Sequence, residues 1–228
     1  MANINEPAGK TQLKVKISQL LQNNRVPLLS ITGVVVAVLV ILGVYFSIQE
    51  KRVARGIEKM ESVIRIYEEQ WLEASEEDRI TLRETLDAEI ELLIKDYPKD
   101  FPGQKALFMK AEMAAQAEEF EAASDSYARL ARSFPESYLA PVALAQAAAN
   151  AEEAGLNDKA REYLEELVTR YQGNKEELYR GLFNLARLQE QAGLTEEAVS
   201  NYSRILDLGG SAGWAGLAQT RLIQLGAE

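Results

Sequence analysis

Carboxylates are the side chains of this chain with the most evident capacity for chemistry. The sequence has 35 Asp and Glu residues among 228, and two carboxylates held close together can act as general acid and base. The two densest clusters, 76–78 (EED) and 118–121 (EEFE), fall at expected helix starts and turns, where solvated acids complement the helix dipole. These clusters therefore indicate surface charge and not a catalytic pair.

Composition excludes two other kinds of chemistry. Histidine and cysteine do not occur, so the chain has no imidazole base, no thiolate nucleophile and no Cys or His metal ligand. A phosphate-binding loop is also absent from the sequence. We predict a protein that is not an enzyme and that has no cofactor, no metal site and no small-molecule substrate.

The charge balance narrows the class of partner. Residues 51–228 carry 33 acidic and 21 basic side chains, a net charge of −12. The only cluster of basic residues among them lies beside the apolar segment described next. An acidic domain repels the phosphate backbone of nucleic acids. We therefore expect no nucleic acid as a partner.

The first element that the sequence defines is an apolar segment at residues 26–48. It contains no charged residue in 23 positions, and as a helix it would be about 34 Å long, against a hydrocarbon core of roughly 30 Å. Asn24 can cap this helix, and Tyr45 and Phe46 suit a membrane interface. We predict a transmembrane helix. The alternative is a cleaved signal peptide, although the apolar run is long for one and no A-x-A-like site follows it.

The residues that flank the segment bear on its orientation. A short polar tail, residues 1–25, precedes it, and basic residues occur in equal number before it (Lys10, Lys14, Lys16 and Arg25) and after it (Lys51, Arg52, Arg55 and Lys59). A large domain crosses the membrane largely regardless of its charge, whereas basic residues in a short tail favour keeping that tail in the cytoplasm. We therefore predict a cytoplasmic N-terminus. The reversed orientation is the alternative.

A helical hairpin is predicted directly after the segment, over residues 49–98. An amphipathic stripe runs uninterrupted through Gln49–Ala74, and Ser75 with Asp78 forms an N-cap box for a second helix that ends at Pro98. We expect the two helices to pack antiparallel.

An internal repeat organises the rest of the chain. The stretch AGLNDKAREYL (154–164) returns as AGLTEEAVSNY (192–202), in which we expect Gly193 to end one helix and Thr195 to cap the next. The repeat keeps four positions in register at spacings of 37 or 38 residues: a large residue (Leu107, Leu144, Leu182), a small residue (Ala74, Ala111, Ala148, Ala186), the anchor (Leu86, Ala123, Ala160, Ala198) and a large residue (Ile90, Tyr127, Leu164, Tyr202).

This spacing predicts helical hairpins. Small residues allow two helices to cross closely, and the large residues fill the space above and below the crossing. A generic alanine-rich bundle is the alternative, but such a bundle need not keep its register over several repeats.

The offset pattern L-x3-A-x11-A-x3-[YL] resembles the tetratricopeptide repeat. The resemblance covers residues 86–208 well and 54–98 more weakly, since Gln70 and Leu86 replace the expected leucine and alanine. It implies an all-α fold in which a transmembrane helix precedes a tetratricopeptide-like α-solenoid of about four hairpins. The expected parts are a degenerate repeat at 49–98, three repeats at 99–208 and a capping helix at 209–228. A partner-docking tail is the alternative for that last helix.

The resemblance also implies a function. First helices of such repeats line a concave groove that holds a peptide or a partner helix, and Phe108 and Phe183 would be its apolar anchors unless neighbouring helices cover them. In this chain the groove residues would be Lys105, Phe108, Glu112, Val142, Ala145, Ala149, Arg180, Phe183 and Arg187.

The architecture is similar to that of single-span, translocon-associated tetratricopeptide proteins of the bacterial inner membrane. It implies a membrane-anchored scaffold with a periplasmic domain that binds proteins or peptides in its groove and has a chaperone-like role or assists secretion or envelope assembly. The span also leaves room for a membrane-embedded partner. The alternative is a structural subunit or spacer that self-associates through the span and the long helix.

Overall fold

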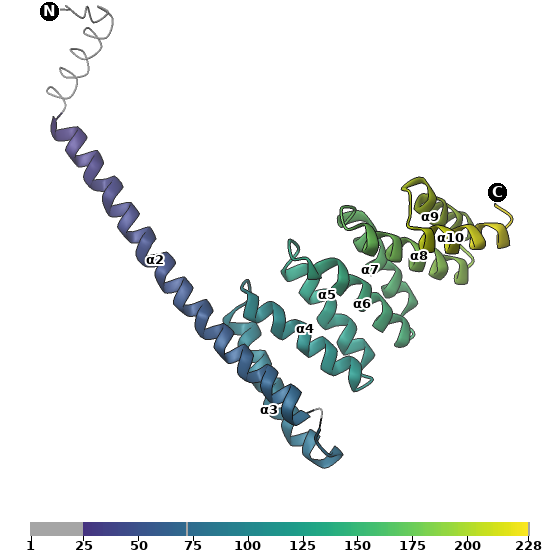
Figure 1. The fold of residues 1–228 in the computed structure, drawn as a ribbon, viewed down its shortest axis with the longest axis horizontal. Coiled ribbons are helices and arrows are strands. Elements are labelled where there is room, and N and C mark those ends of the chain that lie inside the picture. The colour runs from purple at the N-terminus through teal and green to yellow at the C-terminus, as the bar shows by residue number, and fades with distance from the viewer. Residues whose placement is uncertain (1–24, 72, 228) are drawn as a thin grey trace, which may run out of the picture. The chain divides into compact units, whose positions relative to one another are not determined.

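A computed structural model describes residues 25–71 and 73–227 of the chain (Figure 1). All regular elements in these residues are helical, which confirms the all-α prediction. The predicted tail at 1–25 and the Asn24 cap lie outside the described residues, apart from Arg25. The elements are α2 (Arg25–Ile66), the π-helix η1 (Tyr67–Trp71), α3 (Glu76–Asp96), α4 (Phe101–Gln116), α5 (Phe120–Ser133), α6 (Leu139–Glu153), α7 (Asn157–Arg170), α8 (Lys175–Gln191), α9 (Thr195–Asp207) and α10 (Ala212–Gln224).

The chain divides into two compact units, residues 1–54 and 55–228. In the described part of the first unit, α2 is long and apolar enough to cross a membrane, and none of its most apolar stretch is buried by protein. Leu39 and Phe46, for example, are 62% and 65% exposed. Side chains of this kind need an apolar environment, which a bilayer provides. The single candidate span predicted from the sequence is therefore present, while its orientation stays a prediction.

The second unit begins with an antiparallel pair of helices. A Cβ built on Gly56 of α2 would lie 2.7 Å from the ring of Tyr97, just past the end of α3. At the other end of the pair, the Arg79 side chain donates a hydrogen bond to the carbonyl of Trp71 at 3.4 Å. Because early residues of the first helix face late residues of the second, the hairpin is antiparallel, as predicted.

The turn of this hairpin differs from the prediction in one respect. The first helix does not continue as an α-helix to Ala74; α2 ends at Ile66 and the chain continues as η1. A π-helix has wider turns and redirects the side chains that it carries. Here Trp71 becomes buried and the Tyr67 hydroxyl accepts a hydrogen bond from Gln116 at 2.7 Å. The predicted cap of α3 is confirmed, since the amide of Asp78 donates to the Ser75 hydroxyl at 3.3 Å.

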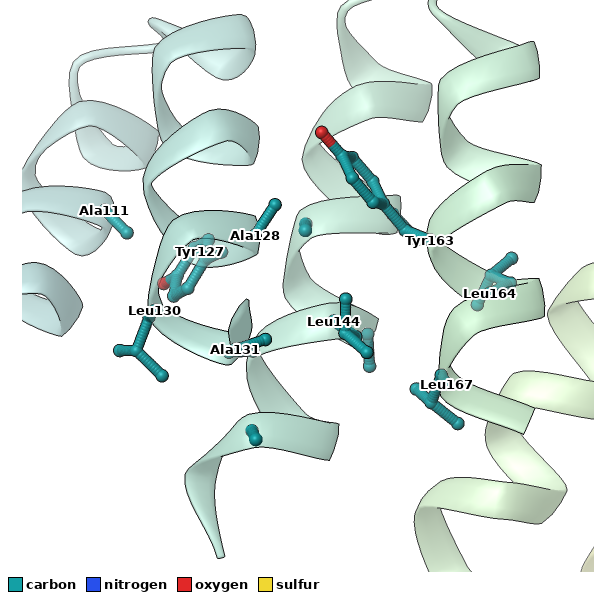
Figure 2. Packing of buried hydrophobic residues seen from close by; sticks show 14 of the residues in the cluster. Ala111, Tyr127, Ala128, Leu130, Ala131, Leu144, Tyr163, Leu164 and Leu167 are labelled. Atoms are coloured by element: carbon teal, nitrogen blue, oxygen red, sulfur yellow. The ribbon is translucent and has the colours of Figure 1, made fainter. Parts of the chain in front are cut away.

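Consecutive helices pack against one another throughout the second unit. Contacts join α3 to α4, α4 to α5, α5 to α6, and so on to α9 with α10, and α6 also contacts α8. The repeat positions form the interior of this packing. The crossing alanines Ala111, Ala123, Ala160, Ala186 and Ala198 are fully buried, and Figure 2 shows Tyr127, Leu144 and Leu164 among the buried side chains between neighbouring helices. Every predicted repeat position from Leu86 onward is buried, whereas Ala74 is half-buried, because it lies in the turn after η1 and not on a helix.

Glycines end several helices and fix one helix start. Gly193 has a φ of +76°, and its amide donates to the carbonyl of Glu190 at 3.0 Å, so it ends α8 as predicted. Thr195 does not cap α9; the cap residue is Leu194, whose side chain makes no capping hydrogen bond. At the start of α4, a Cβ built on Gly103 would lie 1.9 Å from the carbonyl oxygen of Tyr97, so only glycine fits there without movement.

The last helix covers the end of the packed series. α10 contacts both α9 and α8. On its inner side, Ala218 and Leu222 are buried, and Trp214 and Leu225 are half-buried against the core.

Candidate functional site

The nine residues predicted to form a binding face lie on α4, α6 and α8, the first helices of the predicted repeats. Lys105, Phe108, Glu112, Val142, Arg180, Phe183 and Arg187 are half-buried, Ala149 is exposed and Ala145 is buried. Ala145 is only 9% exposed and offers a partner almost no surface. We treat these residues by helix, as an α4 group, an α6 group and an α8 group. The α6 group offers a partner mainly Ala149 and the half-buried Val142.

The α8 group is occupied by contacts within the chain. The Phe183 ring lies edge-on to Tyr202, with centroids 5.4 Å apart, and 5.8 Å from Trp214 of α10. The Trp214 indole N–H in turn donates to Glu176 at 2.9 Å. Of the two readings left open by the sequence, Phe183 fits the one in which a neighbouring helix covers the ring.

The two arginines of the α8 group also have partners. The Arg187 guanidinium donates two hydrogen bonds, of 2.7 and 2.6 Å, to the carboxylate of Glu152 on α6. This bidentate pair lowers the pKa of Glu152, chiefly through the hydrogen bonds from Arg187 and against the opposing effect of burial. Arg180 lies 3.5 Å from Glu177. The α8 group is therefore neutralised and joins α8 to α6.

The α4 group is less fully occupied. The Lys105 ammonium lies 5.3 Å from the centre of the Phe108 ring, and that ring lies edge-on to Tyr127 with centroids 5.8 Å apart. Glu112 forms no ion pair with any described residue. Burial raises the pKa of Glu112, and the positive charge of Lys105 only partly offsets that effect.

Two tyrosines complete this arrangement, and neither was among the predicted site residues. Tyr127 of α5 is 4% exposed, and burial, followed by the charges of Glu112 and Tyr67, raises its pKa to about 12. Burial also raises the pKa of Tyr67, whose hydroxyl lies near Glu112 and accepts the hydrogen bond from Gln116. We call Tyr67, Lys105, Phe108, Glu112 and Tyr127 the Glu112 cluster.

Sequence reasoning could have found Tyr127 but not Tyr67. Tyr127 is a repeat position on the helix that pairs with α4, so its proximity to Phe108 follows from the hairpin. Tyr67 is 45 positions before Glu112, and it comes near only because η1 closes the preceding hairpin.

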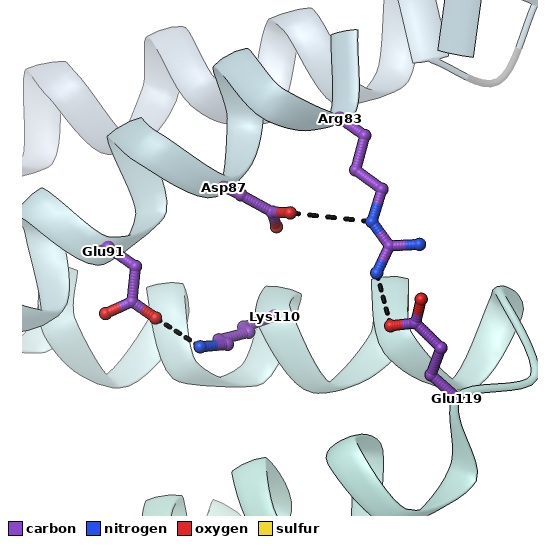
Figure 3. A network of polar contacts seen from close by, with 5 residues as sticks. All are labelled: Arg83, Asp87, Glu91, Lys110 and Glu119. Atoms are coloured by element: carbon purple, nitrogen blue, oxygen red, sulfur yellow. Dashed lines mark hydrogen bonds and ion pairs between the residues drawn. The ribbon is translucent and has the colours of Figure 1, made fainter. Parts of the chain in front are cut away.

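The acidic clusters lie elsewhere. Glu118, Glu119 and Glu121 line a shallow surface hollow of about 560 Å³. Figure 3 shows Arg83 of α3 between Asp87 and Glu119. Partly exposed ion pairs of this kind contribute little free energy, and the pair with Glu119 joins α3 to the N-cap residue of α5. In the part of the chain that the structure describes, no group of three acidic side chains could hold a metal ion.

Comparisons with known proteins identify no relative. No family model matches the chain, and no curated protein or solved structure matches it. The resemblance to tetratricopeptide repeats thus rests on the register of the repeat and on the helical hairpins.

Proposed function

We propose that this protein is a membrane-anchored scaffold whose second unit is a tetratricopeptide-like α-solenoid and binds proteins or peptides along α4, α6 and α8. Two observations support the architecture: one helix near the N-terminus is long and apolar enough to span a membrane, and helical hairpins follow with buried alanines at a fixed repeat distance. The proposed location is the bacterial inner membrane, with the second unit in the periplasm and a role that is chaperone-like or assists secretion.

One observation carries the binding function. On α4, an aromatic ring and a carboxylate lie half-buried on one helical face, and the carboxylate has no ion-pair partner among the described residues. Aromatic side chains are enriched in protein–protein interfaces, and a half-buried carboxylate without an ion-pair partner can gain a charged hydrogen bond from a partner. Tethering to the bilayer would raise the effective concentration of such a surface for other membrane-associated chains.

Site-specific photo-crosslinking in native membranes tests the binding function. Phe108 and Phe183 contact other rings, so a probe there would disturb packing. Ala149 is exposed, and it lies 37 positions after Glu112 at the equivalent place on α6. We expect a photoreactive residue at Ala149 to capture other proteins, and one at exposed Arg129 on the second helix α5 to capture far less.

Two other outcomes would contradict the proposal. Equal capture at both positions would indicate nonspecific contact, and capture of only a second copy of this chain would favour the structural subunit or spacer. Orientation is tested separately by fusing alkaline phosphatase after residue 228. Activity is expected, because the enzyme folds only outside the cytoplasm, and a stable but inactive fusion would refute the periplasmic location.

A further inference from the structure

We propose that the Glu112 cluster binds a lysine or arginine side chain of the partner protein, an inference that rests on the proposed function. The cluster provides one carboxylate, two tyrosine hydroxyls and three aromatic rings around a half-buried position on α4. Ammonium and guanidinium groups carry several hydrogen-bond donors and a positive charge. They are the protein side chains whose chemistry matches this set.

The carboxylate is the first part of the argument. Glu112 is partly removed from water, and it has no ion pair with a described residue. Lys105, seven positions earlier on the same helix, holds its ammonium over the Phe108 ring and not in an ion pair with Glu112. A partly desolvated anion without a close countercharge gains most from an incoming cation.

The aromatic rings are the second part. The faces of aromatic rings attract cations, and more strongly where water is excluded. Lys105 already makes such a contact with Phe108, and the Phe108 side chain is only half-buried, so part of it remains open to solvent. The negative charge of Glu112 also acts on Tyr67 and Tyr127, which places both tyrosines beside the carboxylate.

The third repeat shows how this fold satisfies a charge at the equivalent place. Arg187 lies 75 positions after Glu112, and the chain supplies Glu152 as its bidentate partner. For Glu112, the preceding hairpin supplies the tyrosine Tyr67, which is not a cation. The opposite charge is therefore left for a partner to supply.

The overall charge supports the same occupant. Residues 51–228 have a net charge of −12. Such a field attracts basic segments and speeds their association, and it disfavours acidic ones. We therefore expect the bound segment to be a stretch of protein with a basic residue at the position that meets Glu112.

The first test uses the full chain in native membranes, with the photoreactive probe at Ala149. Glu112→Gln should reduce capture about ten-fold, which corresponds to the loss of one favourable charged contact. Glu153→Gln removes the same charge from an exposed site on α6 and should leave capture unchanged. Equal yields from the two variants would overturn the proposal.

The second test locates the contact. A synthetic peptide of the captured segment is bound to the detergent-solubilised full chain, and its basic residue is replaced by norleucine, which keeps the alkyl chain and removes the charge. The replacement should weaken binding about ten-fold in the wild type and scarcely at all in Glu112→Gln. An equal loss in both proteins would show that the basic residue lies elsewhere.

The two proposals fail in different ways. If the Ala149 probe captures no protein, the binding function itself is wrong. If capture occurs but does not depend on Glu112, or the captured segments contain no lysine or arginine, only the basic-residue inference is wrong.

Discussion

Gly103→Ala should destabilise the protein far more than alanine at a glycine that has free space around it. A Cβ at Gly103 would lie 1.9 Å from the carbonyl oxygen of Tyr97 and 2.8 Å from its carbonyl carbon. A carbon and a carbonyl oxygen need roughly 3.3 Å, so the start of α4 would have to move by more than 1 Å. That carbonyl also accepts a hydrogen bond from the Asp100 amide at 3.2 Å, which the movement would weaken.

The loss of stability follows from two unfavourable terms and one favourable term. Overpacking costs about 1–3 kcal/mol, and loss of the hydrogen bond costs about 1 kcal/mol. Alanine regains about 1 kcal/mol of helix propensity, so the net loss is about 1–3 kcal/mol. For a chain of this length it lowers the melting temperature by roughly 2–4 °C per kcal/mol.

Two other glycines provide the controls. Gly173 has no atom within 4 Å of a built Cβ, so Gly173→Ala should change the melting temperature little. At Gly181 the nearest atom, 2.6 Å away, is the end of the flexible Leu167 side chain, so Gly181→Ala should have an intermediate effect. Thermal unfolding of the detergent-solubilised chain, followed by circular dichroism, measures all three. A Gly103→Ala protein as stable as Gly173→Ala would refute the close approach of α4 to the end of α3.

Three further predictions concern single side chains. Trp214→Ala should lower the free energy of unfolding in urea by about 1–3 kcal/mol, since the indole covers Phe183 and donates a hydrogen bond; an unchanged midpoint would contradict this. The pKa of Glu152 lies below its ordinary 4.5 because of Arg187, so the pair stabilises the fold above that pH and its contribution is lost as pH falls through the folded pKa; Glu152→Gln should flatten the acid side of a stability-against-pH curve. Tyr171→Phe should not destabilise, and should stabilise by up to about 1–2 kcal/mol, because the Tyr171 hydroxyl is buried without a partner; a clear loss of stability would reveal an unseen hydrogen bond.

The hairpins could be predicted from the sequence because their determinants are local and repeated. Alanines at fixed spacing mark where helices cross, and from Ala111 onward they are buried in the structure. The cap at Ser75 was predictable for the same reason, since the residues that form it lie three positions apart. Thr195 was not, because a polar residue two positions after a glycine suits either a cap or the first helical turn, and the backbone geometry after Gly193 decides between them.

The site was predictable in part. The register of the repeat placed Phe108 and Glu112 together on one face of α4. It could not show that Trp214 covers Phe183, nor that Tyr67 approaches Glu112, because these contacts join distant parts of the sequence. Contacts of this kind depend on how a hairpin closes and how the last helix packs.

The repeat determines where a side chain lies, and the residue type at that position determines which contacts it can make. Phe108 and Phe183 occupy equivalent positions and make the same edge-on contact with a tyrosine. Four residues further along each helix the chain has Glu112 in one repeat and Arg187 in the other. Arg187 is paired within the chain, and Phe183 is covered by α10, so this repeat contributes to stability. The α4 repeat keeps a half-buried carboxylate beside an aromatic ring, and for this reason we expect a partner to bind at Glu112 first.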